Sequence, residues 1–294
     1  MTIGCTIGLA LAVAATAIGA DSPAHYSLKL DTLITPDMQS MGLVVKARVD
    51  DGPVLRMLLD SGAQHVVLDK HAAARSGRKS GSAFEMVGVG AVSRNCKRAA
   101  PGRLQIGDLV LHDCDIVVVD GQLLEGIDGI IPLSLFGDYL VRLDVRSKML
   151  QLDAYPFAPV AGEGYLPVRS DHRLFFLQTV LNESQPGYVL LDTGATYNAV
   201  SLTAARSSRN YWSLSNEILL VGSSGGIGGF RLSQGVRFRC GERTFSADPA
   251  VAIDLSNFSR HHEFEVTGIL GYPALRNSVV TVNYRDSLVR IEAK

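Results

Sequence analysis

A long internal repeat constrains the fold of this chain more than any other feature. A shift of 132 positions places "VKARVDDGPVLRMLLDSGA" (45–63) over "LQTVLNESQPGYVLLDTGA" (177–195) without a gap. Each copy has an apolar-patterned segment, a polar turn with Gly or Pro, and a second apolar segment that ends at an Asp. Turn residues between two such segments predict a β-hairpin. We therefore expect two similar modules built mainly of strands.

A second pair of segments lies downstream at a shift of 139 positions. "GIIPLSLFGDYLVRLDVRSKMLQL" (129–152) lies over "GILGYPALRNSVVTVNYRDSLVRI" (268–291), and each ends in a strand, a polar turn and a strand. The two halves therefore share one order of elements, and their length difference falls between the two motifs. Helix-forming residues follow each Asp motif, at 66–77 and 201–208, and predict two short helices.

Local composition predicts further segments of the chain. Residues 3–19 are apolar, carry no charge and end in small residues, which predicts a secretory signal peptide and an exported protein. "AYPFAPVAGEG" (154–164) is rich in Pro and Gly and predicts a linker between the two modules. The predicted division is a signal peptide (1–20), an N-terminal arm (21–40), lobe 1 (41–155), a linker (156–165) and lobe 2 (166–294).

The charge balance limits the classes of binding partner that we expect. The 294 residues are 47% hydrophobic and 19% charged, with a net charge of −1, which is typical of a globular protein with a large core. Without a basic stripe we expect no nucleic acid, and without a further long apolar segment we expect no membrane contact beyond export. A polypeptide or a small molecule remains. Three cysteines remain beyond Cys5. Either Cys96 and Cys114 form a disulfide and Cys240 is free, or all three are buried thiols.

The two Asp loops carry the candidate chemistry. One Asp-Ser/Thr-Gly sequence alone predicts only a turn. Two copies at equivalent positions of a duplicated module would meet near a pseudo-two-fold axis, with Asp60 facing Asp192. Two adjacent carboxyls do not both ionise easily, so one stays protonated while the other is charged. Such a pair activates water against a peptide carbonyl, and the chemistry needs no metal or cofactor.

The residues after each Asp have roles in this arrangement. We expect the hydroxyls of Ser61 and Thr193 to bond across to the opposite loop. The glycine and the alanine that follow let the backbone bend and pack closely. These residues are Gly62 and Ala63 in the first copy, and Gly194 and Ala195 in the second.

On "LLDSGA" and "LLDTGA", together with "DGIIPLSLF" and "TGILGYPAL", the chain resembles the retropepsin-like aspartic proteases, in a tandem, single-chain bacterial form. The resemblance spans roughly residues 41–294. It implies a mainly β, bilobal, pseudo-two-fold acid-protease (retropepsin/pepsin-like) fold of two closed β lobes with short helices. It also implies that Asp60 and Asp192 are the catalytic dyad and that the substrate is a polypeptide.

The resemblance further implies a flap over the cleft from each lobe. By position, the flaps are expected near 84–92 and 219–230. Glycine suits hairpins that open for a substrate. The flap glycines are Gly88 and Gly90 in the first lobe, and Gly225 and Gly226 in the second.

Pro132 and the lack of symmetry between the flaps leave an alternative function open. Pro132 stands where the second copy has Gly271, and Gln64-His65 is bulkier than the resemblance leads us to expect. A catalytically silent peptide-binding module on the same scaffold is therefore the alternative function. Because both Asp motifs lie in one chain, we expect a monomer rather than half of a larger dimer. His261-His262-Glu263 lacks a third metal ligand and is interpreted as a solvated loop.

Overall fold

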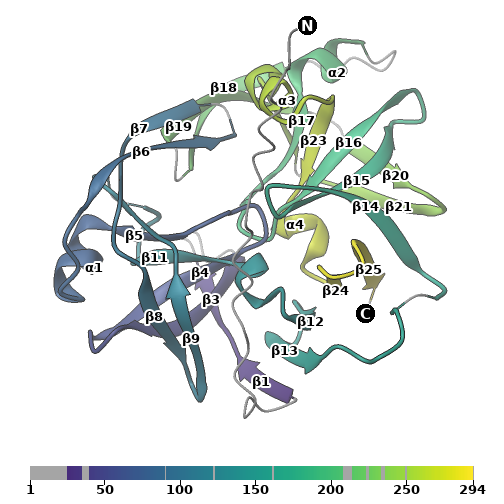
Figure 1. Ribbon diagram of the computed structural model, residues 1–294. Helices are drawn as coiled ribbons and strands as arrows, with labels where there is room; N and C mark the ends of the chain where they lie inside the picture. The colour runs from purple at the N-terminus through teal and green to yellow at the C-terminus, as the bar shows by residue number, and fades with distance from the viewer. Residues whose placement is uncertain are drawn as a thin grey trace, which may run out of the picture.

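The computed structural model describes residues 25–34, 40–89, 91–121, 123–160, 162–207, 214–222, 225–232, 236–248 and 250–293. The predicted signal peptide and Gly90 lie outside these residues. The described strands form two lobes and a sheet that runs between them (Figure 1). The mainly β, bilobal fold expected from the sequence is confirmed. The bounds of the lobes and linker stay a prediction.

The first lobe is a sheet in which β2 to β11 surround the first Asp motif. Their order is β6-β7-β10-β5-β11-β4-β3-β8-β9, with β2 paired to β3. The strands are β2 (Asp31–Ile34), β3 (Ser40–Val49), β4 (Val54–Asp60), β5 (Val66–Asp69), β6 (Ser82–Gly88), β7 (Ala91–Arg98), β8 (Gly102–Ile106), β9 (Leu109–Cys114), β10 (Ile116–Val119) and β11 (Gly129–Pro132). The helices are α1 (Lys70–Arg75) and a 3-10 helix, η1 (Leu133–Phe136).

The second lobe repeats this arrangement around the second Asp motif. Its strands are β15 (Leu174–Leu181), β16 (Gln185–Leu191), β17 (Asn198–Ser201), β18 (Leu214–Gly222), β19 (Gly225–Leu232), β20 (Val236–Cys240), β21 (Arg243–Ala247), β22 (Ala250–Ile253) and β23 (Val266–Leu270). Its helices are α2 (Leu202–Ser207), α3 (Ser256–His262) and α4 (Tyr272–Leu275).

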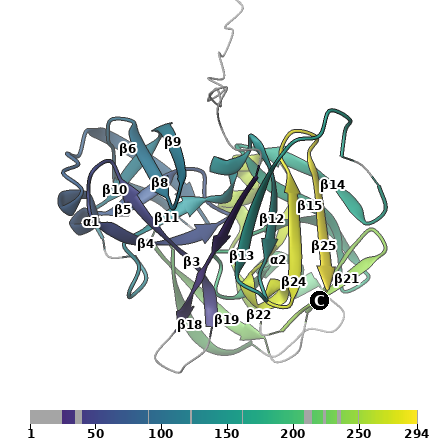
Figure 2. The same cartoon turned by 90° about the horizontal axis from the view of Figure 1, so that it is seen from below.

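A central sheet joins the two halves of the chain, and sequence reasoning did not anticipate it. Its strands are β1 (His25–Lys29), β13 (Met149–Ala154), β12 (Tyr139–Asp144), β24 (Ser278–Asn283), β25 (Leu288–Ala293) and β14 (Tyr165–Asp171), in that order. The terminal hairpin of each half pairs with the other through β12 and β24, and Figure 2 shows these strands side by side. The sheet then continues into β15 of the second lobe.

The strand registers of the two lobes correspond position by position. In the first lobe Ile130 of β11 lies opposite Leu58 of the parallel strand β4. In the second lobe Ile269 of β23 lies opposite Leu190 of β16. These pairs are related by the same shifts of 139 and 132 positions that relate the sequence segments. Each Asp therefore ends a strand that is buried between the same two neighbours.

Equivalent caps start the two short helices. Asp69 ends β5, and its carboxylate accepts a hydrogen bond from the Ala72 amide at 2.6 Å. Ser201 ends β17, and its hydroxyl accepts one from the Ala204 amide at 3.0 Å. Asp and Ser are favoured at this position because their side-chain oxygens satisfy amides that have no partner within the helix. The helices predicted after each Asp motif thus begin at matched residues.

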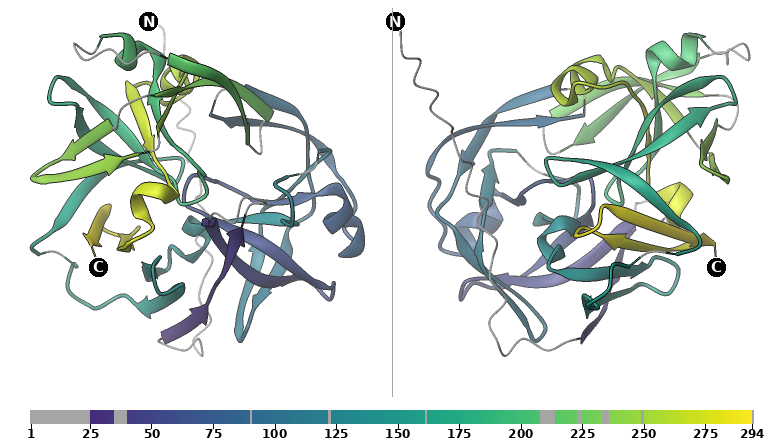
Figure 3. Two further views of the ribbon diagram at one scale, coloured as in Figure 1. Left: turned by 180° about the vertical axis from the view of Figure 1, so that it is seen from behind. Right: turned by 45° about the vertical axis from the view of Figure 1, so that its right-hand side comes forward.

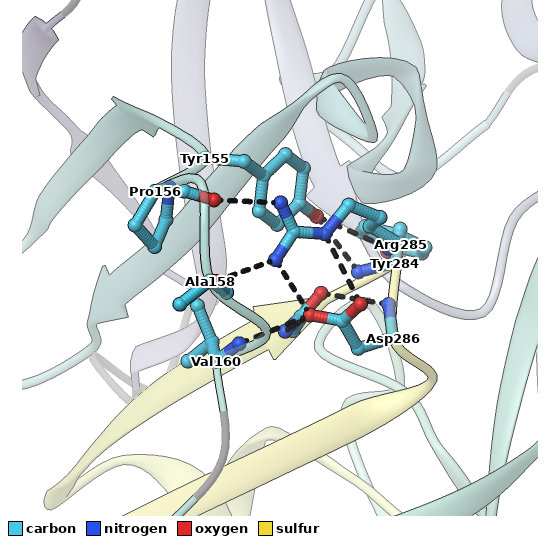
Figure 4. Close-up of polar contacts among 8 residues, drawn as sticks. Tyr155, Pro156, Ala158, Val160, Tyr284, Arg285 and Asp286 are labelled. Carbon is cyan, nitrogen blue, oxygen red and sulfur yellow. Dashed lines mark hydrogen bonds and ion pairs between the residues drawn. The ribbon is translucent and has the colours of Figure 1, made fainter.

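The segment predicted as a linker (156–165) is held against the turn between β24 and β25 (Figure 4). The guanidinium of Arg285 donates to the carbonyl of Pro156 at 2.9 Å and to that of Ala158 at 3.2 Å. The same guanidinium is paired with the carboxylate of Asp286. These bonds hold the connecting segment to the last hairpin of the chain.

The three described cysteines are buried free thiols, which answers the question that the sequence left open. Burial raises the pKa of Cys114 and of Cys240 to about 11, so both thiols stay protonated at neutral pH. None of the helices in the described part of the chain has the length and apolar character that a membrane crossing requires.

The interpretation of residues 261–263 as a solvated loop is wrong for His262, while His261 and Glu263 are exposed. His262 ends α3 and is buried, with its Nδ1 2.5 Å from a carboxylate oxygen of Asp171. The rings of Phe176, Phe258 and Phe264 surround it. Burial lowers the pKa of His262 despite that carboxylate. Among the described residues, no group of His, Cys, Asp and Glu is arranged to hold a metal ion.

Candidate active site

The two Asp loops meet between the lobes. Asp60 ends β4 and Asp192 follows β16, and the leucines before each of them are buried. A buried apolar strand that ends in a tight turn brings its carboxyl to the surface of the core without burying it inside. The carboxyls of Asp60 and Asp192 are hydrogen-bonded to each other and line one cleft.

Four cross-lobe hydrogen bonds join the loops through their hydroxyl residues. The Ser61 hydroxyl donates to the Leu191 carbonyl at 2.8 Å and accepts from the Thr193 amide at 2.9 Å. The Thr193 hydroxyl donates to the Leu59 carbonyl at 3.0 Å and accepts from the Ser61 amide at the same distance. Both hydroxyl residues are buried, so these bonds satisfy backbone groups that water does not reach. Each loop is thereby held by the other lobe.

Each glycine of the motif lies directly against the opposite carboxyl. A Cβ built on Gly62 would lie 2.5 Å from Cγ of Asp192, and one built on Gly194 would lie 2.3 Å from Cγ of Asp60. No side chain fits at such distances. Glycine is therefore required here by the close approach of the two loops. The alanines that follow, Ala63 and Ala195, line the cleft.

The surroundings of the pair favour retention of a proton. Burial among apolar walls raises the pKa of both carboxyls, and the adjacent charge of Asp192 raises that of Asp60 further. Asp60 accepts a backbone hydrogen bond from Gly62 at 2.7 Å, and the Gly194 amide also lowers its pKa. Asp192 accepts two, from Gly194 at 3.0 Å and Ala195 at 2.8 Å. The pKa of Asp60 is raised further than that of Asp192, because the charge of Asp192 adds to the effect of burial, so the shared proton is favoured on Asp60.

The lobes differ behind these loops, at Pro132 and Gly271. In the second lobe the Gly271 amide donates to Oδ1 of Asn198 at 2.9 Å. In the first lobe the equivalent residues are Pro132, which has no amide hydrogen, and Val66, which has no acceptor in its side chain. The donor and its partner are thus both absent from the first lobe. Pro132 still pairs with Asp60 across the parallel strands β11 and β4.

The predicted flap regions are two hairpins that contact each other. The first pairs β6 with β7 and contains Gly88, and the second pairs β18 with β19 and contains Gly225 and Gly226. Figures 1 and 3 show the blue and the green hairpin next to each other, and β7 contacts β19. Val89 packs against the apolar cluster of the second lobe. The first hairpin therefore reaches across to the opposite lobe.

The walls of the cleft are apolar on both sides of the carboxyl pair. Sequence reasoning did not find most of these residues, because they come from loops and strands whose register only the fold defines. In the first lobe the wall is formed by Leu58, Met86, Leu123, Leu124, Ile127 and Ile130. In the second it is formed by Leu174, Ala199, Val251, Ile253, Phe258 and Ile269. The arrangement can receive an extended chain with apolar side chains beside two carboxyls.

Comparisons with known proteins agree with this geometry. Residues 45–135 match the family model described as Aspartyl protease. Among solved structures, the chain is similar to the "Crystal structure of aspartic proteinase from Irpex lacteus", with a TM-score of 0.56 and 14% sequence identity, covering 92% of this chain and 98% of that one. No curated protein matches the chain in sequence. The chain therefore has the bilobal, mainly β fold of a pepsin-like aspartic proteinase, and residues 45–135 within it are similar to the aspartyl protease family.

Proposed function

We propose that this protein is an aspartic endopeptidase that hydrolyses peptide bonds with a water molecule activated by Asp60 and Asp192. The observation that carries the proposal is the hydrogen bond between the two carboxyls in an apolar cleft between the lobes. The cross-lobe bonds of Ser61 and Thr193 support it, because they keep the two carboxyls in one geometry. Preorganised acid and base groups at hydrogen-bond distance are what general acid–base catalysis requires.

The proposed reaction needs only these two side chains and water. The ionised carboxylate, which the smaller rise in pKa favours at Asp192, takes a proton from the water as its oxygen attacks the peptide carbonyl carbon. The protonated carboxyl of Asp60 donates its proton to the carbonyl oxygen. The tetrahedral intermediate then collapses as the amide nitrogen receives a proton from Asp192, the hydroxyl proton returns to Asp60, and the C–N bond breaks. The pair ends the cycle with one proton between its two carboxyls, as it began.

We further propose that the enzyme is a monomer of the retropepsin-like, tandem single-chain type and that it is exported. The presence of both Asp loops in one chain supports the monomer, and the apolar residues 3–19 support export. Light scattering of the purified protein tests the first statement. Fractionation of expressing cells tests the second.

Substitution of either Asp tests the proposed activity. We expect Asp60→Asn and Asp192→Asn each to reduce the cleavage of a denatured protein by about 10²–10⁴-fold, the size of a general acid–base contribution. Circular dichroism and thermal melting check that both variants stay folded. A transition-state-mimicking inhibitor of aspartic proteases should block the wild type. Retained activity in either variant would contradict the proposal.

The alternative is a peptide-binding module without catalysis, for which the replacement of the Gly271 and Asn198 pair by Pro132 and Val66 is the motivation. It predicts peptide binding without cleavage from acidic to neutral pH. The hydrogen bond between the carboxyls favours the enzyme, because a silent scaffold has no need to keep them in contact. The pH profile of kcat/KM distinguishes the two hypotheses, since a peptidase with a shared-proton pair gives a bell-shaped curve.

A further inference from the structure

The cleft contains one described side chain that can carry a positive charge. Its titratable lining residues in the described part of the chain are Asp60, Asp192, His65 and Tyr197. The Asp pair with one shared proton has a charge of −1, and a phenol is neutral. His65 is therefore the only described lining group that can attract an acidic side chain. His65 belongs to the Gln64-His65 pair, which is bulkier than the resemblance to the aspartic proteases leads us to expect.

The ring of His65 is held in place by an acidic residue and an aromatic one. Its Nδ1 lies 2.9 Å from Oδ2 of Asp115, and its edge meets the ring of Phe84 in the first flap hairpin at 5.1 Å. Asp115 is itself anchored, because the Val66 amide donates to its carbonyl at 3.1 Å. In the described residues nothing bonds to Nε2 of His65, and 19% of the side chain remains exposed. Nε2 is thus the nitrogen left for a ligand.

The charges around this ring do not cancel when it is protonated. Asp115 also contacts Arg98 of β7, with its Oδ1 3.2 Å from Nε, and the Arg98 guanidinium lies over the ring of Phe84. The hydrogen bond with His65 is the main cause that keeps the pKa of Asp115 below its usual value, so this carboxyl is ionised. The carboxylate of Asp115 is thus shared by two cationic groups when His65 is protonated. The cluster of His65, Asp115 and Arg98 has a net charge of +1 with a protonated imidazole and zero with a neutral one.

The second lobe offers no equivalent. The shift of 132 positions places Tyr197 where the first lobe has His65. Tyr197 also lines the cleft, but its phenol cannot provide a positive charge. An acidic side chain of a bound peptide would therefore be attracted on the first-lobe side of the carboxyl pair and not on the other side.

We propose, on the basis of the proposed peptidase function, that His65 is a specificity-determining residue that pairs through Nε2 with a carboxylate side chain of the substrate. Asp115 is the positioning residue that orients the ring. The preferred substrate has apolar residues around the scissile bond and one Glu or Asp that lies against the first lobe. The preference requires the protonated imidazole, because a neutral ring carries no charge to pair with the carboxylate.

A peptide series tests this. A single Glu, or Gln as its neutral match, is moved through each position of an apolar peptide, and kcat/KM is measured at pH 5 and pH 8. We expect Glu to exceed Gln by about 10-fold at one position at pH 5, the size of a charge-assisted hydrogen bond, and to lose this advantage at pH 8. The ratio is independent of how the overall rate varies with pH.

Variants assign the preference to one residue. His65→Gln should reduce the Glu-to-Gln ratio to about one, whatever its absolute rates. Tyr197→Phe is the matched control and should keep the ratio. Asp115→Asn removes the carboxylate that orients the ring, so the Glu-to-Gln ratio at pH 5 should fall. A ratio that persists in His65→Gln would overturn the proposal.

The same series separates this proposal from the proposed function. Cleavage with no Glu preference at any position would overturn the role of His65 and leave the peptidase standing. Absence of any cleavage would overturn the peptidase. In that case the two peptides are titrated against the full-length wild-type protein by fluorescence polarisation, and equal affinities for Glu and Gln peptides at pH 5 would overturn the role of His65 as well.

Discussion

The two lobes hold their Asp residues on the same strand register but support them with different chemistry. In the second lobe the residue behind the loop is Gly271, whose amide is bonded to Asn198. In the first lobe the same two positions are Pro132 and Val66, and Val66 is buried. A donor and its acceptor have been replaced together by two apolar residues. A buried polar pair and an apolar pair are both acceptable, whereas half of a polar pair leaves a buried group without a partner.

The difference extends to the space behind each loop. A Cβ on Gly271 would lie 2.4 Å from the carbonyl oxygen of Tyr197 and 2.9 Å from that of Ala195. The ring of Pro132 occupies the corresponding place in the first lobe, so the loop at His65 must leave room for it. The second loop accordingly packs tightly and gives its Asp two amide hydrogen bonds, while the first gives one. Two similar loops thus give their carboxyls unequal surroundings.

The largest expected effect tests what the lobes have in common. Ser61→Ala and Thr193→Val each remove one hydroxyl and leave a carbonyl and an amide of the opposite loop buried without partners. At about 1–3 kcal/mol for each group, either variant should lose about 2–5 kcal/mol of unfolding free energy, measured by urea denaturation. Ser61→Thr and Thr193→Ser keep the hydroxyl and serve as controls. A large loss of unfolding free energy in one variant with none in the other would show that only one of the two hydroxyls holds the loops together.

The next effect tests what separates the lobes. Asn198→Val leaves the Gly271 amide buried without an acceptor, and Val66→Asn buries an amide side chain opposite a proline that cannot donate. Each should cost about 1–3 kcal/mol of unfolding free energy, although each copies the residue of the other lobe. Thermal and urea unfolding measure both. If Val66→Asn proved neutral, the paired replacement would not explain the asymmetry.

The smallest effect concerns the pH dependence of stability. The folded pKa of Asp60 is raised above its unfolded value, so the folded state binds more protons between the two values and wild-type stability falls as the pH rises through that window. The Asp60→Asn variant has no carboxyl at this position, so its stability does not fall with pH for this reason. Its stability relative to the wild type should therefore increase from pH 4 to pH 7, by an amount on the order of 1 kcal/mol.

Melting temperatures of both proteins at the two pH values measure this difference. Asp192→Asn is the matched variant, and its gain should be smaller because the pKa of Asp192 is raised less than that of Asp60. A gain that shrinks as the pH rises would contradict the raised pKa. A larger gain in Asp192→Asn would reverse the assignment of the shared proton.

Local signals explain which elements the sequence could predict. The apolar runs before Asp60 and Asp192 and the turn residues before those runs indicate hairpins, and the caps at Asp69 and Ser201 start the two helices where helix formers follow. The solvated loop expected at His262 is wrong because its burial depends on Asp171, which lies far away in the chain. The central sheet was missed for the same reason, since β12 and β24 carry no local sign of their pairing.

Both Asp loops and the strands that lead into them can be predicted from the amino-acid sequence, because they follow from patterns within a few positions. Only the packing of the two lobes makes the loops interlock, places each glycine against the opposite carboxyl, and raises the pKa of Asp60 further than that of Asp192. Each of these contacts depends on how two halves of the chain, 132 positions apart, pack across the axis. No local preference encodes such contacts, because they form only where the two lobes pack together.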